Sequence, residues 1–404
     1  MKGLIIIHEI HPTQGSECRS GFFFLKELIQ LNEDIVLDVI IPTNNIFKTS
    51  NYFIEVKKEL EHLKILTKIN LINVDQPNKN ILSSILKFFQ IKNKGVGNVF
   101  LYYYLYNLWL KKVLRYITPY KYDFIHTYNH INIFSLVDFS RKTHKWYVGP
   151  VTGFSYVPSS FNTGFVEIIR KFIQFYSKFK LKALSSKITC LYVVSKIDYD
   201  YALKLGFKKI IRLPEQCYEN YICNNDSNKQ SNYLELVWIG DLVIRKQLDI
   251  LLNSLIGIGI YYHLNVLGDG PELKKLEFFS KQNKLNVDFL GRVDRGKVFQ
   301  YLQNSNVLIH TSYREGTATT LIEAVSFSNF VIAHNIGGHD LIINTSTGIL
   351  IPLISKSISI SRFREAIINC NNKIKSINSF EETDFHFNWR SMTNIIYKNY
   401  LHEI

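Results

Sequence analysis

Paired cysteines and long apolar runs are both missing from this chain of 404 residues. Its five cysteines are odd in number and no two of them show the CxxC spacing, which fits a reducing compartment and argues against a structural zinc site. No run of about 18 apolar residues occurs, so the sequence predicts no transmembrane helix. The opening MKGLIIIHEIHP holds an apolar run too short for a signal peptide, and His8, Glu9 and His11 interrupt it.

Two common nucleotide-binding motifs are absent as well. Leu4–Ile7 predicts a first buried strand, and the stretch from about Ser20 to Leu31 predicts a helix. The loop between them contains neither GxGxxG nor GxxxxGK followed by Ser or Thr, which excludes a dinucleotide fingerprint and a P-loop there. Ile35–Ile41 and Leu63–Ile72 predict the next strands.

Positive charge, by contrast, is present in excess. Lys and Arg number 48 against 34 Asp and Glu, which gives a formal net charge of +14. Such an excess suits a nucleic acid, an anionic membrane surface or anionic small molecules, and the charge alone does not choose among them. The apolar fraction of 46% is ordinary for a soluble globular protein, and the length suits two or three domains.

The most informative stretch runs from Val307 to Leu350. Val307–His310 predicts a short buried strand, Thr319–Ser326 a helix and Phe330–Ala333 the next buried strand, which together make a βαβ unit. The polar loop 311–317 therefore lies at the carboxyl end of a strand, where open α/β sheets bind their ligands.

Two glutamates border this loop. Glu315 lies in the loop and Glu323 in the first turns of the helix. The free N–H groups at Thr319 and Thr320 and the helix dipole favour an anion such as a diphosphate. A carboxylate on each side can accept hydrogen bonds from sugar hydroxyls. Taken alone, the two glutamates could also be solvated surface charges.

This segment resembles the donor-site signature of retaining GT-B glycosyltransferases, glycosyltransferase family 4 in particular. The family pattern is Glu-x7-Glu-Ala, an apolar strand and a Gly-Gly turn, matched here by Glu315, Glu323, Ala324, Gly337 and Gly338. The resemblance implies that Glu315 contacts the donor sugar, that Glu323 holds the nucleotide ribose, and that Gly316 lines the donor site. Thr317-Ala318 stands where the family usually has Phe-Gly, which changes the expected shape of the sugar pocket.

A pair of cations lies in an earlier loop, after the predicted strand Leu234–Ile239. Arg245 and Lys246 come just before the predicted helix Gln247–Leu255. Two cations at a helix start can neutralise a departing diphosphate, so both are candidate catalytic residues. A plain pair of surface charges is the alternative interpretation.

This earlier loop also resembles a family segment in which Gly-Arg is followed, four residues on, by Lys-Gly. Gly240 and Lys246 match the segment, whereas Asp241 and Gln247 depart from it. The resemblance implies that Gly240 belongs to the donor site. Arg292, which follows the predicted strand Val287–Gly291, is expected to flank the base.

The N-terminal half offers candidates with weaker signals. The run from Pro12 to Glu17, PTQGSE, resembles a family loop that reaches towards the donor, which makes Gly15 a donor-site candidate; an ordinary capped turn is the alternative. Most family members have a catalytic histidine at the end of the strand that corresponds to Trp146–Val148, and this chain has none there. His126 and His130 are nearby in sequence, and His126 is the catalytic candidate, with a structural role as the alternative.

No metal site or cofactor is expected. Asp198-Tyr-Asp200 matches the Asp-x-Asp metal motif of the other glycosyltransferase fold, but residues two apart on a predicted helix point to different sides. The resemblance implies a UDP-, GDP- or ADP-sugar as donor substrate.

Two segments, 83–120 and 165–187, mix Lys and Arg with aromatic residues at helical spacing. Such helices can lie in an anionic membrane interface, or their aromatic residues can be core and their lysines a solvated face; both interpretations stay open. Single-stranded nucleic acid also suits such a pattern, but no recognisable nucleic-acid module accompanies it, so no nucleic-acid partner is expected.

With the resemblance, the sequence predicts an α/β fold of the GT-B type, with two Rossmann-like domains whose parallel sheets face a cleft. The predicted ranges are 1–212 for the acceptor-side domain, 213–385 for the nucleotide-sugar domain and 386–404 for a helix crossing back to the first.

The implied activity is retaining hexosyl transfer from a nucleotide-diphosphate sugar to a hydroxyl of a glycan or lipid-linked acceptor in bacterial surface polysaccharide synthesis. The expected location is the cytoplasm, or peripherally the inner face of the cytoplasmic membrane. The alternatives are another GT-B enzyme such as an epimerase and a non-catalytic binding protein.

Overall fold

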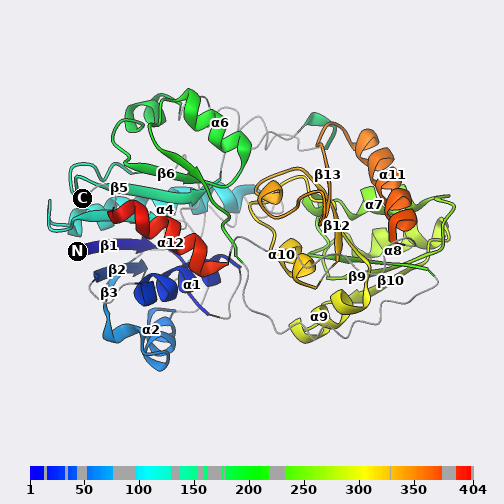
Figure 1. Cartoon of the computed structure of the whole chain (residues 1–404), viewed down its shortest axis with the longest axis horizontal. Coiled ribbons are helices and arrows are strands. Elements are labelled where there is room, and N and C mark those ends of the chain that lie inside the picture. Colours follow the sequence, from blue (N-terminus) through cyan, green and yellow to red (C-terminus); the bar gives the residue numbers. More distant parts are fainter. Residues whose placement is uncertain are drawn as a thin grey trace. The chain divides into compact units, whose positions relative to one another are not determined.

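The computed structural model describes residues 1–12, 16–31, 35–42, 52–75, 96–128, 137–152, 158–161, 175, 178–217, 233–327, 329–374 and 388–401. The chain divides into two compact units (Figure 1). The first comprises Met1–Phe154, Phe165–Gln216 and Trp389–Ile404, and the second comprises Ser155–Gly164 and Cys217–Asn388. Each unit is built around one parallel sheet, which confirms the predicted α/β class.

Within the described residues, the first sheet has seven parallel strands in the order β3-β2-β1-β4-β5-β6-β7. These strands are β1 (Lys2–Ile7), β2 (Val36–Pro42), β3 (Ile69–Val74), β4 (Phe124–Tyr128), β5 (Trp146–Val151), β6 (Cys190–Val193) and β7 (Ile210–Arg212). The inner strands β4, β5 and β6 are buried along their whole length. Burial on both faces explains why these strands read as unbroken apolar runs in the sequence.

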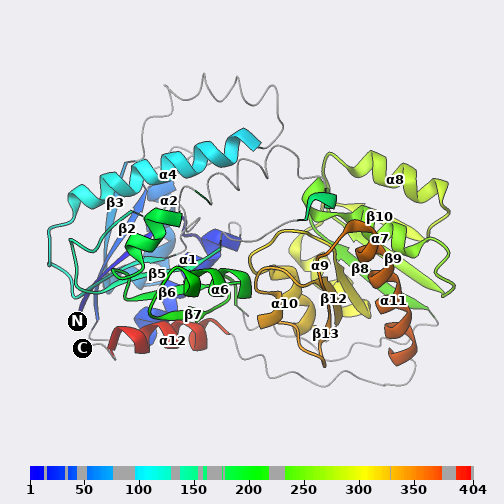
Figure 2. The same cartoon turned by 90° about the horizontal axis from the view of Figure 1, so that it is seen from above.

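The helices of the first unit cover both faces of its sheet. They include α1 (Ser16–Leu31), α2 (Tyr52–His62), α4 (Val96–Tyr116), α6 (Lys196–Lys204) and α12 (Trp389–Leu401), with the short 3-10 helix η1 (Ile65–Thr67) and a helical segment at 178–184. Helices α4 and α12 lie on opposite faces (Figure 2). Trp109 and Leu110 of α4 pack in one core cluster with Leu4, whereas α12 packs against α1, with Trp389 stacked on Phe23.

The second sheet has six parallel strands among the described residues, in the order β10-β9-β8-β11-β12-β13. The strands are β8 (Leu234–Ile239), β9 (Tyr262–Leu267), β10 (Val287–Gly291), β11 (Val307–His310), β12 (Phe330–His334) and β13 (Gly348–Ile351). The helices are α7 (Leu248–Leu255), α8 (Leu273–Gln282), α9 (Arg295–Asn304), α10 (Thr319–Ser326) and α11 (Lys356–Ile374), with the 3-10 helices η3 (Ser159–Phe161), η4 (Ile244–Lys246) and η5 (His339–Leu341).

Successive residues of the strands in this sheet pack into two different layers. Leu236 and Trp238 of β8 belong to a cluster that contains Leu251 of α7 and Phe363 of α11. Val237, between them, belongs to the cluster that contains Leu321 of α10. Side chains of a strand alternate between faces, so the sheet is covered on both sides and its carboxyl edge stays available for loops.

Two predicted boundaries are wrong. The strand expected at Leu63–Ile72 begins only at Ile69, because Lys64 has a left-handed backbone (φ 57°) and η1 occupies the residues that follow. The helix expected from Ser20 begins at Ser16. None of the helices in the described ranges has the length and apolarity needed to cross a bilayer.

Two aromatic residues of α4 are core residues, whereas Tyr116 at its end is 67% exposed. Tyr106 and Trp109 are 1% and 0% exposed, and the Trp109 indole donates a hydrogen bond to the carbonyl oxygen of Val74 at 2.9 Å. These aromatic residues therefore hold α4 on the sheet, and they are not available to a membrane surface.

Candidate functional site

The chain order of the second sheet reverses between β8 and β11. Strands β9 and β10 extend the sheet on one side of β8, while β11 returns to its other side. Open α/β sheets bind ligands at such a reversal, beyond the carboxyl ends of the strands. The loops that follow β8 and β11 are residues 240–247 and 311–318, so the two predicted ligand loops meet there.

Side chains of the β11 loop tie the two loops together. The hydroxyl of Thr311 donates to the carbonyl oxygen of Lys246 at 2.8 Å, and the Ser312 hydroxyl oxygen lies 3.1 Å from the carbonyl oxygen of Arg245. The indole of Trp238 donates to the Thr311 hydroxyl at 3.1 Å. The backbone that carries the two cations is therefore held in a fixed position beside the β11 loop.

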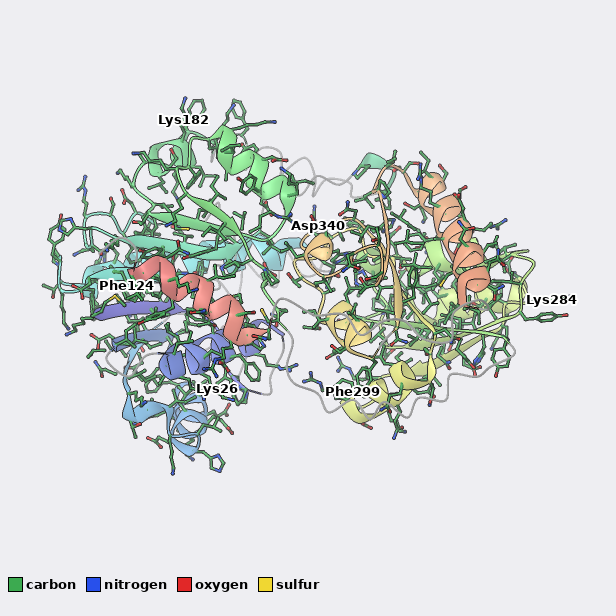
Figure 3. All side chains as sticks on the ribbon, viewed as in Figure 1. Lys26, Phe124, Lys182, Lys284, Phe299 and Asp340 are labelled. Atoms are coloured by element: carbon green, nitrogen blue, oxygen red, sulfur yellow. The ribbon has the colours of Figure 1, made fainter. Side chains whose placement is uncertain are left out.

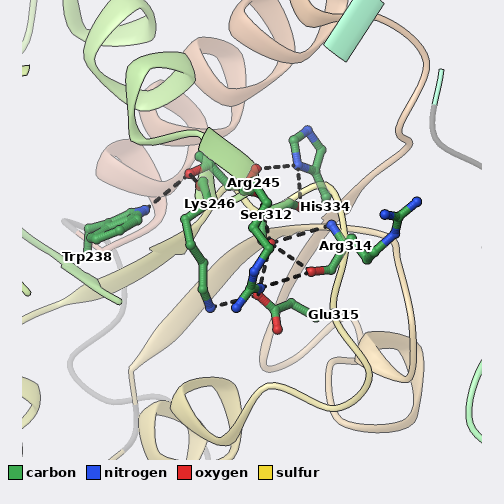
Figure 4. A network of polar contacts seen from close by, with 8 residues as sticks. Trp238, Arg245, Lys246, Ser312, Arg314, Glu315 and His334 are labelled. Atoms are coloured by element: carbon green, nitrogen blue, oxygen red, sulfur yellow. Dashed lines mark hydrogen bonds and ion pairs between the residues drawn. The ribbon is translucent and has the colours of Figure 1, made fainter. Parts of the chain in front are cut away.

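The two predicted cations and the first predicted glutamate converge on one atom. Arg245 Nη1 lies 2.6 Å from Glu315 Oε1, and Lys246 Nζ lies 2.7 Å from the same oxygen (Figure 4). The hydroxyl of Ser312 also donates to this oxygen, at 2.9 Å. One carboxylate oxygen thus gathers three donors from the two loops.

Electrostatics keep Glu315 ionised. Burial by itself would raise the pKa of Glu315, but the charges of Lys246 and then Arg245 outweigh it and lower the pKa to about 2. The side chains of Glu315 and Lys246 are 15% and 14% exposed, whereas Arg245 is 44% exposed. At neutral pH the three groups therefore carry a net single positive charge, and water screens Lys246 and Glu315 less than it screens Arg245.

Helix α10 begins beside this ion cluster. Its N-cap residue is Ala318, which makes no side-chain cap, and the Leu321 amide bonds only back to the Ala318 carbonyl. The hydroxyl oxygen of Thr320 is buried without a hydrogen-bond partner. Thr319 and Thr320 thus present a helix start whose donors suit an anion, as predicted from the sequence.

The second predicted glutamate lies on the inner side of α10. The side chain of Glu323 is 12% exposed, and Arg295 Nη2 of α9 lies 3.1 Å from its Oε1. The Arg295 guanidinium also lies over the Phe299 ring, 5.3 Å from the ring centre. The sequence analysis did not predict Arg295, because a single Arg at the start of a helix does not indicate which carboxylate it contacts in the folded chain.

The Gly337-Gly338 turn packs closely against the backbone of the Glu315 loop. The Gly338 amide donates to the Gly316 carbonyl at 2.9 Å. Gly337 has φ +54°, and a Cβ at this position would lie 2.1 Å from the Gly316 carbonyl oxygen and 2.4 Å from that of Glu315. Only glycine fits this close approach, which explains why a glycine follows the strand at this point of the Glu-x7-Glu pattern.

We expect Gly337→Ala to displace the Glu315 loop and to weaken binding of a nucleoside diphosphate. Gly257→Ala is the matched control, since Gly257 has φ +61° and a methyl group added there would meet no atom within 4 Å. Both variants carry the left-handed backbone cost of about 1 kcal/mol, seen as a lower melting temperature. Only Gly337→Ala should also lose affinity in calorimetry; equal affinities would contradict the supporting role.

Three buried histidines lie beneath the same loop. His334 Nδ1 contacts the Thr311 and Ser312 carbonyls at 3.0 and 3.1 Å, and His339 Nδ1 contacts the His334 carbonyl at 2.8 Å. Burial lowers the pKa of His334 and of His339 to about 4 and that of His310 well below its usual value. All three are therefore neutral at pH 7 and add no positive charge near Arg245 and Lys246. The sequence analysis did not predict this group of histidines.

Arg292 and Gly240 lie at the same edge of the sheet. Arg292 is 84% exposed, and its Nη2 is 3.9 Å from Asp241, which replaces the arginine of the family pattern. The carbonyl oxygen of Gly240 would be 1.8 Å from a Cβ at Gly268, so the β8 and β9 loops approach closely. Both residues thus belong to the region of the cations, although no contact joins Arg292 to them in the described part of the chain.

His126 does not fit the catalytic role expected for it. It is 0% exposed; Nε2 contacts the Gly149 carbonyl at 2.8 Å and Nδ1 contacts the Tyr400 hydroxyl. Burial lowers the pKa of His126 to about 3, although the bond to Gly149 opposes that shift. Because β4 lies inside the first unit beneath α12, we assign His126 a structural role.

The remaining predicted positions separate into two groups. Gly15 and His130 lie outside the described residues. The Asp198 carboxylate accepts a hydrogen bond from the hydroxyl of Ser195, the N-cap residue of α6, and Asp200 pairs with Lys196. Among the residues that the structure describes, no three His, Cys, Asp or Glu side chains gather as metal ligands would.

Part of the chain matches a known protein family. Residues 224–372 match the family described as glycosyl transferases group 1. An alpha-1,4-N-acetyl-D-galactosaminyltransferase of Campylobacter jejuni, whose name gives a PP-undecaprenol-linked acceptor, is 31% identical over 118 residues, 29% of this chain and 32% of that protein. The chain spans about a third of the length of the curated relatives it matches.

Solved structures show the fold over the whole chain. The lipopolysaccharide outer core galactosyltransferase WaaB in its apo form has a TM-score of 0.59 at 16% identity, covering 100% of both chains. The Anabaena protein HepE in complex with UDP-glucose has a TM-score of 0.59 at 14% identity, again covering 100% of both. The chain thus has the predicted two-domain GT-B architecture of two Rossmann-like parallel sheets.

Proposed function

We propose that this protein, whose second unit carries a domain of the glycosyl transferases group 1 family, moves a sugar from a nucleotide-diphosphate sugar to a hydroxyl group of a glycan. The observation that supports this most is the convergence of Arg245 and Lys246 on Glu315 at the reversal of the second sheet. Two cations and an open helix start form a receptor for a diphosphate.

The proposed reaction breaks the bond between the anomeric carbon and the diphosphate. Negative charge then develops on the leaving diphosphate, and positive charge develops on the sugar ring. Arg245, Lys246 and the amides at the start of α10 stabilise the former, because they are held in place before the reaction begins. We propose that the acceptor hydroxyl attacks the anomeric carbon on the face that the diphosphate leaves, which places the reaction in the retaining class and needs no nucleophile from the enzyme. The proton of the hydroxyl passes to an oxygen of the departing diphosphate.

Glu315 has two successive roles in this proposal. In the ligand-free chain its Oε1 takes the three donors that surround it. A donor diphosphate, with more negative charge, displaces the carboxylate from the cations. The carboxylate is then free to accept hydrogen bonds from the sugar hydroxyls, which fixes the anomeric carbon near the diphosphate.

Glu323, one turn into α10, anchors the nucleotide. Its contact with Arg295 keeps the carboxylate oriented while it accepts hydrogen bonds from the ribose hydroxyls. Gly316, Thr319 and Thr320 line the path between the two glutamates. Arg292 flanks the base.

We propose a bacterial surface polysaccharide or a lipid-linked oligosaccharide as the acceptor. The Campylobacter relative carries an undecaprenol-linked acceptor in its name, and one structural neighbour is named for lipopolysaccharide outer core synthesis. The first unit would bind this acceptor.

A panel of UDP-, GDP- and ADP-sugars tests the proposal. We expect one nucleotide class to raise the melting temperature, since a ligand at about a hundred times its dissociation constant stabilises a protein by about 2.7 kcal/mol. The same class should release its nucleoside diphosphate when the chain is incubated with the nucleotide-sugar. Stabilisation without release, even with added acceptor glycans, would favour a non-catalytic binding protein, and no stabilisation by any of them would reject the donor site.

A further inference from the structure

Two phenylalanines of the first unit point away from its core. Phe175 and Phe179 are 67% and 70% exposed, and their rings meet edge to face with centres 6.3 Å apart. Residues 178–184 form a helix, and Phe175 is helical too. A spacing of four places both rings on the same side, where they form an exposed aromatic pair. Such a pair in water needs an explanation, since single exposed apolar residues are ordinary and paired large ones are not.

The other side of this helix is already packed. Leu181 and Leu184 are 0% and 4% exposed and belong to the core cluster of the first unit, together with Trp109 and Leu110 of α4. The leucine side of the helix therefore packs into the core of the first unit, and the phenylalanine side remains outside.

Lysines accompany the phenylalanines on the outer side. Lys178 and Lys182 are exposed and lie four residues apart, on one flank of the phenylalanine pair. Figure 3 shows Lys182 at the periphery of the first unit. Lys180 of the same helix lies near Lys111 of α4; burial lowers the pKa of Lys180, and the charge of Lys111 lowers it further.

The stretch of chain that carries this surface has no acidic residue of its own. Between residues 168 and 197 the chain contains no Asp or Glu. Helix α8 of the second unit is a useful contrast, since it exposes Phe278 beside Lys274 but also carries Glu277, and Lys275 pairs with Glu272. An aromatic residue among balanced charges is typical of an ordinary surface, whereas the first-unit surface combines two rings with two lysines that no carboxylate of the described residues pairs with.

We propose that the surface formed by Phe175, Lys178, Phe179 and Lys182 docks on an anionic phospholipid bilayer. The two rings enter the interface between headgroups and acyl chains, and the two lysines contact lipid phosphates. Charge selects this partner, because an uncompensated cluster of lysines attracts an anionic surface and repels a cationic one. The proposal does not depend on the donor site, and it would bring the first unit to lipid-linked acceptors.

Co-sedimentation of the full chain with vesicles tests the proposal. We expect the chain to sediment at low salt with phosphatidylcholine vesicles that contain phosphatidylglycerol, but not with pure phosphatidylcholine, and to be released at high salt. Lys178→Glu with Lys182→Glu should weaken binding by about twentyfold or more, from about fivefold for each lysine near an anionic surface. Phe175→Ser with Phe179→Ser should weaken binding at every salt concentration.

The matched control is Lys274→Glu with Phe278→Ser on α8, which should bind vesicles like the unaltered chain. Nucleoside diphosphate affinity, measured on every variant, should not change, which separates a failure of this surface from a failure of the donor site. Unaltered chain that stays in the supernatant with phosphatidylglycerol at low salt would overturn the proposal. Equal sedimentation of the surface variants and the control would overturn it as well.

Discussion

Replacing Lys246 with Met is expected to lower turnover in the proposed transfer by about a hundredfold or more, the usual cost of one preorganised donor. The Lys246 side chain is only 14% exposed, so its charge acts on a leaving diphosphate with little screening. Arg245 is 44% exposed, and water screens it more. Arg245→Met should therefore cost less, about fivefold.

The measurement is the initial rate of nucleoside diphosphate release at saturating donor and acceptor. Lys275→Met is the matched control, because Lys275 is 77% exposed, lies on α8 of the same unit and pairs with Glu272. Melting temperatures of the variants show that each remains folded. A folded Lys246→Met enzyme that keeps wild-type turnover would rule out Lys246 as a ligand of the leaving group.

Replacing Glu315 with Gln is expected to change binding and turnover in opposite directions. The variant removes the negative charge that neutralises Arg245 and Lys246, so a nucleoside diphosphate should bind about tenfold more tightly. Transfer should fall by about a hundredfold or more, because the amide holds the sugar less well than a carboxylate does. A single-site change that tightens product binding while it slows the reaction is hard to explain by misfolding.

Calorimetry of nucleoside diphosphate binding and the rate assay measure these two effects. Glu272→Gln serves as the control, since it removes another carboxylate paired with a lysine in the same unit. That variant should change neither quantity. Weaker binding of the nucleoside diphosphate to Glu315→Gln would mean that the carboxylate does not occupy the cations in place of the phosphate.

The sequence predicted the framework of the site because the framework depends on local patterns. Short apolar runs at Val307–His310 and Phe330–Ala333 are buried on both sides, and they became β11 and β12. In a parallel sheet every loop at the carboxyl edge lies on one side, so neighbouring strands bring Lys246 and Glu315 to the same place. Which two loops form the candidate site could therefore be predicted from the sequence.

The contacts inside the site were not accessible in that way. Arg295 meets Glu323 only because α9 packs beside α10, and the two residues are 28 positions apart in the sequence. The buried histidines His334 and His339 come together through the turn at Gly337-Gly338, and nothing in their sequence pattern distinguishes them from exposed histidines. That Glu315 occupies the two cations in place of a diphosphate could likewise be proposed only from the distances between the side chains.

His126 shows the opposite failure, in which nearness in sequence was misleading. It was chosen because no histidine follows the strand Trp146–Val148, and it lies on the strand next to it. The side chain points into the layer that α12 covers, where it meets Tyr400 from the far end of the chain. The helix that buries it begins at Trp389, so only the fold reveals the burial.

The central claim is that Arg245, Lys246 and the start of α10 bind the diphosphate of the donor. The most direct measurement compares the affinity of the preferred nucleoside diphosphate with that of its parent nucleoside by calorimetry, in the wild-type and Lys246→Met proteins. The diphosphate should bind the wild type about a hundredfold more tightly than the nucleoside does, from two charge-assisted contacts at about 1.4 kcal/mol each, and Lys246→Met should reduce this ratio. Equal affinities for the two ligands in the wild type would contradict the claim.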